Sequence, residues 1–168
     1  MDPFEALYSD YRDDVYHFLF KLTSYQADLA EEMTQETFYQ AILSFGRFRG
    51  SCHVKSWLCQ IAKNTYYKKV RSSRREEEYV KSFAHQSQQP DMEEGAESAE
   101  FSAAVLTIIR GFDSKTRDVM LYRLFADLPY RQISALLGIS EESARVIFGR
   151  GKVRLRDELI KEGYSNEV

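Results

Sequence analysis

The sequence predicts an all-α protein: two small helical domains joined by a flexible linker, the C-terminal one a helix-turn-helix. Apolar residues recur in steps of three and four on both sides of one acidic stretch that is poor in aliphatic residues. Hydrophobic residues make up 43% and aromatic residues 14% of the 168 positions, which is enough for real cores. We therefore expect domains at 1–75 and 99–168, with the linker at 76–98 between them.

The first domain is predicted to be a three-helix bundle. Asp2, Pro3 and Glu5 form a capping-box pattern at the start of a first helix that reaches about Leu22. A second helix is expected over 25–43, with Gly46 ending it and 47–52 as a loop. The third helix is expected over 53–71. The apolar positions of the second helix that we expect in the core are Leu29, Met33, Phe38, Ala41, Ile42 and Phe45.

The linker and the second domain follow from composition and turn residues. Residues 76–98 are rich in Glu, Gln and Ser, a composition that cannot bury enough apolar surface to order itself. Beyond them, a helix closes at Gly111 and the next begins at Asp113 or Ser114. A short helix (130–137) and a longer one that reaches about Lys161 complete the domain.

A basic stretch lies in the middle of the chain. From Thr37 to Arg75 there is no Asp or Glu, although the whole chain carries a net charge of −3. Aromatic residues alternate with its cations, a combination suited to phosphates and stacked bases. A solvated helix face is the alternative interpretation, but the exclusion of acids favours contact with nucleic acid. The cations are Arg47, Arg49, Lys55, Lys63, Lys68, Lys69, Arg71, Arg74 and Arg75.

Residues 129–160 have the layout of a helix-turn-helix. Gly138 permits a left-handed turn between the two helices, Ile139 fills the corner and Ser140 caps the second helix. An ordinary helical hairpin with a basic exterior is the alternative. The positions that face solvent or a DNA groove are Ser143, Arg145, Val146, Gly149, Arg150 and Lys152.

Four acidic side chains and one glutamine lie at three- and four-residue spacing on the second helix. The residues are Asp28, Glu31, Glu32, Gln35 and Glu36. Such spacing places them on one face, and like charges this dense destabilise a helix unless cations meet them. From the sequence alone, a solvated surface is the default interpretation of this face.

No catalytic or metal-binding pattern is found. The sequence lacks the glycine-rich, nucleophile-elbow and zinc-protease motifs, so we expect neither an enzyme nor a small-molecule substrate or cofactor. Cys52, His53 and Cys59 lack a fourth ligand at suitable spacing, which argues against a metal. Two cysteines, and no signal peptide or membrane-length apolar run, predict a cytoplasmic protein.

Three segments in this order resemble the extracytoplasmic-function (ECF) sigma factors of the sigma-70 family. The segment 29–41, LAEEMTQETFYQA, is similar to that family's helix for binding core RNA polymerase. The segment 48–75, FRGSCHVKSWLCQIAKNTYYKKVRSSRR, is similar to its promoter-melting segment. The segment 129–155, PYRQISALLGISEESARVIFGRGKVRL, is similar to its promoter-upstream reader.

The resemblance implies roles for individual residues. For core polymerase binding they are Asp28, Glu32, Gln35 and Glu36. For the melted minus-ten strand they are Arg47, Arg49, His53, Trp57, Lys63, Asn64, Tyr67 and Lys68. For the minus-thirty-five element they are Arg131, Ser143, Arg145, Val146, Gly149, Arg150 and Lys152. The family often has a polar residue at the position of Val146 and a large aromatic residue or His at the position of Gly149. This departure implies fewer base-specific contacts and a larger contribution of phosphate contacts to DNA binding.

The resemblance also implies partners. These are bacterial core RNA polymerase, promoter DNA as duplex and as melted strand, and an anti-sigma factor that is commonly membrane-anchored. Two other functions remain open from the sequence. One is an autonomous helix-turn-helix regulator whose N-terminal bundle serves dimerisation or ligand binding, and the other is a helical adaptor for protein interactions.

Overall fold

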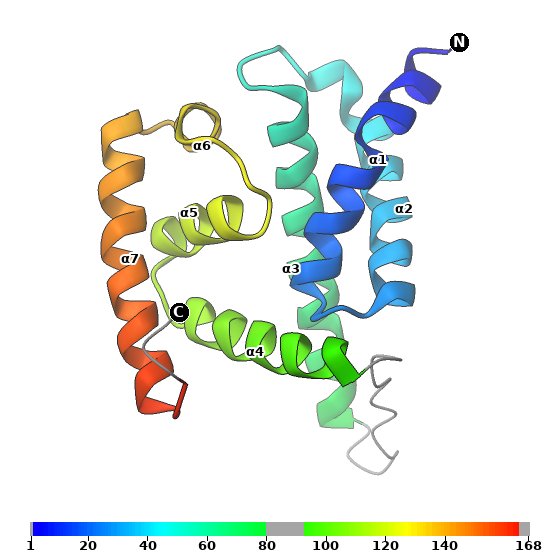
Figure 1. Ribbon diagram of the computed structural model, residues 1–168. Helices are drawn as coiled ribbons and strands as arrows, with labels where there is room; N and C mark the ends of the chain where they lie inside the picture. Colours follow the sequence, from blue (N-terminus) through cyan, green and yellow to red (C-terminus); the bar gives the residue numbers. More distant parts are fainter. Residues whose placement is uncertain (1, 80–92, 165–168) are drawn as a thin grey trace.

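The computed structural model describes residues 2–79 and 93–164, with side chains described for 2–74 and 99–164. Within these ranges the chain forms seven α-helices and one short 3₁₀ helix, and no strand. Helices α1 to α3 form one bundle and α4 to α7 form a second (Figure 1). The prediction of an all-helical fold with two helical bundles is confirmed.

The first bundle consists of α1 (Pro3–Leu22), α2 (Ala27–Ser44) and α3 (Val54–Tyr79). The capping box at the start of α1 is present, because Asp2 accepts from Phe4 N and the Glu5 side chain accepts from Asp2 N. The core of this bundle contains Val15, Phe18, Leu19, Leu22, Ala30, Met33, Phe38, Ala41, Leu58, Cys59 and Ala62. Each helix thus turns one apolar face inward, as the residue spacing predicted.

The ends of α2 differ from the prediction. The helix begins at Ala27 because Ser24 and Tyr25 adopt left-handed backbone angles, with φ of 55° and 65°. At the other end of α2, Gly46 does not end the helix as predicted. The α-helix ends at Ser44 and tightens into the 3₁₀ helix η1 (Phe45–Arg47), which contains Gly46. The left-handed residue of this loop is Gly50, with φ of 73°.

The buried face of α2 also differs from the prediction. Ile42 and Phe45 are 49% and 43% exposed, so their assignment to the core was wrong. Thr34 and Thr37 are buried, and their hydroxyls each donate a 2.7 Å hydrogen bond to a carbonyl one turn back in the helix. Because the helix itself satisfies these hydroxyls, they pack inward without an unpaired polar group.

Helices extend into both ends of the predicted linker. Helix α3 continues to Tyr79, eight residues past the predicted end at 71, and α4 begins at Glu93. The flexible linker expected over 76–98 is therefore helical in backbone at 76–79 and 93–98. The rest of that prediction, over 80–92, lies outside the described residues.

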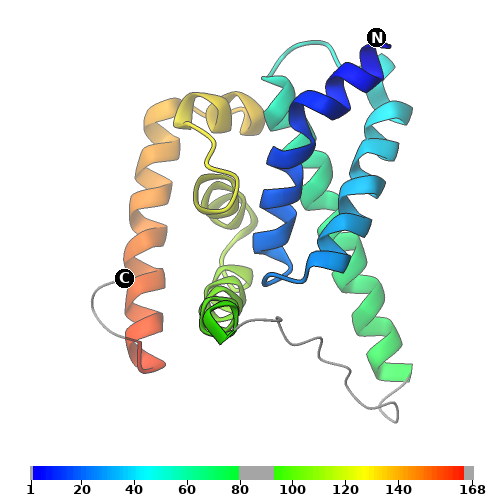
Figure 2. The same cartoon turned by 45° about the vertical axis from the view of Figure 1, so that its right-hand side comes forward.

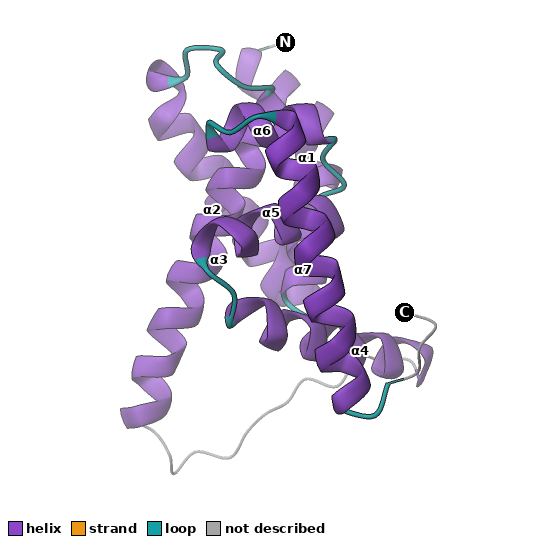
Figure 3. Ribbon diagram, turned by 90° about the vertical axis from the view of Figure 1, so that its left-hand side faces the viewer, coloured by secondary structure: helices purple, strands orange, loops and turns teal. Residues whose placement is uncertain are grey.

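The second bundle consists of α4 (Glu93–Arg110), α5 (Ser114–Leu124), α6 (Tyr130–Leu137) and α7 (Glu141–Lys161). Asp113 caps α5 by accepting from Thr116 N at 3.1 Å, and Ser140 caps α7 by accepting from Ser143 N at 3.0 Å. Gly138 has φ of 68°, the left-handed turn expected between α6 and α7. Figure 3 shows α4 to α7 as helices joined by loops. Ile133 and Ala144 are buried between these helices.

The two bundles pack against each other. Helices α4, α5 and α6 lie between the first bundle and α7, which is on the far side (Figures 1 and 2). Among the described residues, no helix is both long enough and apolar enough to cross a membrane.

Candidate functional site

The acidic face of α2 (Asp28, Glu32, Gln35 and Glu36) is exposed along its length. Its one described ion pair joins Glu32 to Lys69 Nζ of α3 at 3.3 Å, and the two side chains are 64% and 46% exposed. The neighbouring Glu31 turns toward α1 and pairs with Arg12. Asp28, Glu32, Gln35 and Glu36 are therefore available to a partner, whereas Glu31 is already used within the bundle.

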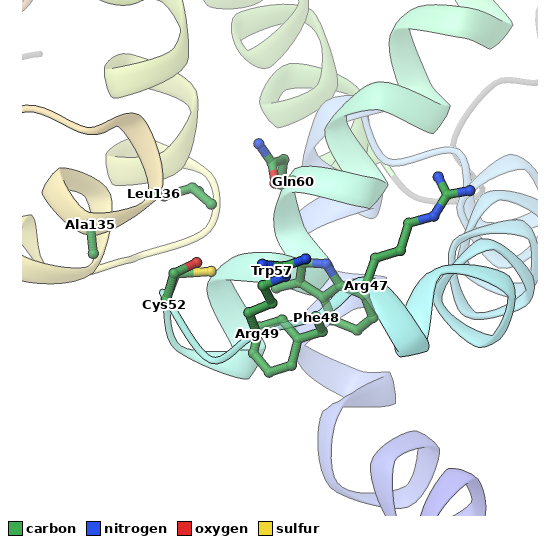
Figure 4. A pocket seen from close by; sticks show the side chains of 9 residues that line it. Arg47, Phe48, Arg49, Cys52, Trp57, Gln60, Ala135 and Leu136 are labelled. Carbon is green, nitrogen blue, oxygen red and sulfur yellow. The ribbon is translucent and has the colours of Figure 1, made fainter.

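The predicted minus-ten residues do not form one continuous strip. Arg47, Arg49 and Trp57 line a pocket of about 210 Å³ at the loop before α3, which Ala135 and Leu136 of α6 close from the second bundle (Figure 4). Trp57 packs on Phe48, with 4.8 Å between ring centroids, and lies edge-on to Phe45. The aromatic residues of the loop thus hold Trp57 while the two arginines stay exposed.

His53 stands at the start of α3, next to this pocket. Its Nδ1 accepts from Lys55 N at 3.2 Å, and its ring is edge-on to Tyr11 at 6.5 Å. The imidazole is exposed, so one ring edge supports the first turn of α3 while the other remains free for a partner.

Lys63, Asn64 and Tyr67 lie about three to four turns beyond His53 on α3, in a cleft of about 500 Å³ between the two bundles. Arg110, Arg117 and Asp118 of the second bundle line the opposite wall. Lys63 Nζ is 3.0 Å from Asp118 Oδ2, and the side chains are only 11% and 19% exposed. Burial raises the pKa of the Tyr67 phenol to about 12, partly offset by the nearby Arg117.

Lys68 lies apart from the other predicted minus-ten residues. It lines a groove of about 510 Å³ between α2 and α3, together with Glu32, Gln35 and Glu36. The helical turn places consecutive residues about 100° apart, so Tyr67 and Lys68 face different partners. The structure thus groups Lys68 with the acidic face.

The exposed face of α7 carries the predicted minus-thirty-five residues. Ser143, Arg145, Gly149, Arg150 and Lys152 are exposed, and Val146 is 44% exposed. The Arg145 guanidinium is 2.7 Å from Glu141 and lies over the ring of Tyr130, so it is already oriented along the helix. Arg131 is exposed on α6, the preceding helix.

Residues at the contact between the bundles were missed by the sequence reasoning. Asp118, Arg117 and Arg110 meet Lys63, Tyr67 and Tyr66, yet each belongs to an ordinary amphipathic helix pattern. No signal in the sequence identified them, because a contact between residues more than 40 positions apart leaves no local periodicity. In the described part of the chain, no group of three or more His, Cys, Asp or Glu side chains could hold a metal ion.

Comparison with known proteins supplies the family. Residues 7–76 match the family described as sigma-70 region 2. The chain is 26% identical to the ECF RNA polymerase sigma factor SigM of Bacillus subtilis, over 97% of this chain and 98% of that protein. It is 24% identical to the RNA polymerase sigma factor YlaC of the same organism, over 95% and 94%. These matches support the assignment of the chain to the ECF sigma factors of the sigma-70 family.

Solved structures agree on the fold. The sigma factor RpoE of Bartonella quintana, in complex with the anti-sigma factor NepR, matches with a TM-score of 0.62 at 19% identity, over 95% of this chain and 98% of that one. CnrH, in complex with the cytosolic domain of CnrY, matches with a TM-score of 0.64 at 16% identity, over 96% and 89%.

As an ECF sigma factor, the protein directs promoter recognition and the initiation of transcription. The match to region 2 spans most of α1, all of α2 and most of α3, which include the acidic face and the basic stretch. The SigM and YlaC relatives also cover the second bundle. These findings support the sigma-factor interpretation over an autonomous helix-turn-helix regulator.

Proposed function

We propose that this sigma factor acts through three separate surfaces, each with a different partner. The observation that carries the proposal is the separation of charge. The acidic face of α2 is exposed, while arginines and aromatic rings gather at the loop before α3 and cations gather on α7. In this scheme residues 1–75 bind polymerase and the minus-ten region, and residues 99–168 bind the minus-thirty-five element.

The acidic face is the docking surface for core RNA polymerase. Asp28, Glu32, Gln35 and Glu36 would meet a basic coiled coil of the polymerase's largest subunit. Tyr39, Ile42 and Leu43 extend the same helix with exposed apolar side chains, which supports a protein partner. Charge guides such an encounter, and apolar burial then stabilises it.

The loop before α3, together with Lys63, Asn64 and Tyr67, holds the melted minus-ten strand. Exposed Arg47 and Arg49 suit phosphates, and the rings around Trp57 suit unstacked bases. The amide of Asn64 is exposed and offers a donor and an acceptor to a base edge. A flipped base costs a few kcal/mol of stacking, which such contacts offset.

The exposed face of α7 reads the minus-thirty-five element as duplex. Its N-terminal end, with Ser143, Arg145 and Val146, enters the major groove, while Arg150, Lys152 and Arg131 contact phosphates. Val146 and Gly149 bring no hydrogen-bonding side chain to the base edges. Phosphate contacts and DNA shape therefore supply a larger share of the affinity here.

An anti-sigma factor regulates the protein. The structural neighbours RpoE and CnrH were solved with the anti-sigma factor NepR and with the cytosolic domain of CnrY, respectively. By extension, we expect a membrane-anchored anti-sigma factor to hold this cytoplasmic chain at the membrane until a signal releases it.

Run-off transcription with purified core polymerase tests the proposal. The double variant Asp28→Arg/Glu32→Arg should lose core binding, because two cations replace anions on the docking face. Asn64→Ala should retain core binding but open DNA poorly, with a lower yield of permanganate-reactive thymines. Core binding is measured by native gel shift, and opening by permanganate footprinting.

A matched control is Asp10→Arg/Asp13→Arg, which makes the same change of charge on exposed positions of α1. It should bind core and initiate as the unmodified chain does. Failure of the unmodified chain to associate with core polymerase would contradict the proposal. Equal core binding by the α2 and α1 double variants would contradict the assignment of the docking face.

A further inference from the structure

Helix α5 of the second bundle covers part of the face of α3 that we assigned to the DNA strand. Asp118 Oδ2 lies 3.0 Å from Lys63 Nζ, and the ammonium group of Lys63 also lies 5.2 Å from the ring centroid of Tyr122. Tyr122 is fully buried and packs near Phe18 of α1, with 6.5 Å between ring centroids. The cation on α3 is thus enclosed by an anion and a ring from one neighbouring helix.

Further contacts join the bundles on both sides of this ion pair. Arg117 lies over the ring of Tyr67 at 5.3 Å, and Arg110 donates to the hydroxyl of Tyr66. Nearer the loop before α3, the Ser56 hydroxyl donates to Gln132 Oε1 at 3.2 Å. Lys63 and Tyr67, two of the three predicted strand-binding residues that line this cleft, therefore have partners within the chain.

We propose that Asp118 acts as an internal competitor of DNA, its carboxylate occupying at Lys63 the place of a strand phosphate and holding the two bundles closed. The proposal rests on the function proposed above, in which Lys63 contacts the melted strand. A carboxylate and a phosphate oxygen are interchangeable acceptors for an ammonium donor. The Asp118 contact and a strand contact at Lys63 therefore exclude each other.

The chemistry of the pair favours a contact that can be released. Lys63 is almost fully removed from water, and a buried ammonium without an anion is strongly unfavourable. In the closed arrangement the cation therefore needs an anion, which Asp118 supplies. Once the bundles separate, Lys63 returns to water and a strand phosphate can bind it there. Arg110 and Arg117 in the same cleft would be freed together with it when the bundles separate.

Closure lowers the apparent affinity for single-stranded DNA. Only the open fraction of the protein binds the strand, so the apparent dissociation constant is the intrinsic one divided by that fraction. A change that opens the bundles should raise the affinity even though it adds no contact in the strand site.

Small-angle X-ray scattering of the full chain, combined with fluorescence anisotropy of a labelled single-stranded oligonucleotide, tests the proposal. Asp118→Lys places a cation against Lys63 and should increase the radius of gyration without DNA. It should also tighten oligonucleotide binding by about tenfold. Asp157→Lys, an equal charge change at an exposed position of α7, is the matched control and should leave both quantities unchanged.

The exchange variant Lys63→Asp/Asp118→Lys should restore the radius of gyration of the unmodified chain, because the ion pair re-forms in the opposite sense. This restoration also shows that Asp118→Lys acts through the contact and not through unfolding. A radius of gyration in Asp118→Lys equal to that of the control overturns the proposal.

The proposed competition between Asp118 and DNA is also contradicted if Asp118→Lys is open but binds the oligonucleotide no more tightly than Asp157→Lys does. Lys63→Ala in the Asp118→Lys background then separates the two ideas. If it weakens oligonucleotide binding, the strand contact of Lys63 stands and only the competition is wrong. If it has no effect, the proposed role of Lys63 in the strand site fails.

Discussion

The burial of Lys63 could not be predicted from its sequence context. In the basic stretch Lys63 is one of nine cations, and nothing local separates it from Lys68 or Lys69. In the structure Lys68 is exposed on the groove beside α2, whereas Lys63 is buried at the contact between bundles. Its position at the contact between the bundles, and not its residue type, determines that Lys63 is buried and pairs with the second bundle.

Cys59 is a buried thiol whose protonation should affect stability at alkaline pH. It is fully buried, and burial raises the pKa of its thiol from 9.0 to about 12, with smaller opposing effects of Lys55 and Asp14. Below pH 9 the thiol is protonated in both folded and unfolded chains. Between pH 9 and 12 the unfolded chain ionises first, so stability falls as the pH rises.

We predict that Cys59→Ala reduces this alkaline loss. A single group contributes at most about 1.4 kcal/mol per pH unit over that range, and the variant removes this contribution. The measurement is the free energy of unfolding by urea at pH 8 and at pH 10.5. The difference between the two pH values matters, because the smaller side chain also loosens the core at either pH.

Cys52→Ala is the control for this prediction, since burial also raises the pKa of Cys52 but that side chain is only partly buried. Its alkaline loss should stay closer to that of the unmodified chain. An identical loss in Cys59→Ala and in the unmodified chain would show that the Cys59 thiol does not govern the effect.

At the scale of the helices, the packing of α7 on α5 depends on a glycine that the sequence marks only as a weak helix former. A Cβ atom at Gly151 would lie 2.6 Å from Met120 Sδ and 3.2 Å from Met120 Cγ. Met120 is fully buried, so it has little room to move. A Cβ atom at Gly149 would meet nothing within 4 Å. Gly151 is thus a packing position and Gly149 is not.

We therefore predict opposite effects for two alanine substitutions two residues apart. Gly149→Ala should stabilise the chain by about 1 kcal/mol, the difference in helix propensity between the two residues. Gly151→Ala gains the same propensity but overpacks the contact with Met120, at a typical cost of about 1–3 kcal/mol, so it should be neutral or destabilising. Urea unfolding at neutral pH measures both.

Gly151→Ala combined with Met120→Ala makes this comparison sharper. The shorter side chain frees space at the contact, so adding the methyl group at 151 should be less harmful in that background than in the unmodified chain. Equal stabilisation by both single substitutions would mean that α5 and α7 are packed less closely than the structure shows.

At the scale of the whole molecule, the contact between bundles decides which surfaces are free. Asp28, Glu32, Gln35 and Glu36 and the outer face of α7 are exposed in the closed arrangement, whereas part of the proposed strand-binding face is covered. Under the proposed function, the closed chain is thus compatible with polymerase docking and duplex contact before it can hold a single strand.

Cys52 offers a chemical probe of this arrangement. It lines the pocket that Ala135 and Leu136 of α6 close from the second bundle (Figure 4). Separation of the bundles exposes this thiol and removes part of the burial that raises its pKa. We predict that iodoacetamide labels Cys52 faster in Asp118→Lys than in the unmodified chain, as followed by mass spectrometry of the tryptic peptide.

Asp157→Lys should label Cys52 at the rate of the unmodified chain, and Cys59 should remain unlabelled in all three proteins because it is buried within the first bundle. Labelling of Cys59 would report unfolding and not opening. Equal Cys52 rates in the Asp118 and Asp157 variants would show that α6 stays on the loop when the ion pair is removed.

The sequence by itself determined the helical class, the caps and turns, and the separation of acidic and basic surfaces. Asp2, Gly138 and Ser140 act within one or two turns of their own position, so local chemistry specifies them. The capping box of α1 and the left-handed turn of the helix-turn-helix could be predicted for that reason.

Only the tertiary structure decided which members of those surfaces are free. It exposed Ile42, buried Thr34, split the basic stretch among two pockets and a groove, and paired Lys63 with Asp118. Each of these outcomes depends on a neighbour from another helix, and the sequence pattern of one helix carries no record of the side chains that a distant helix brings against it.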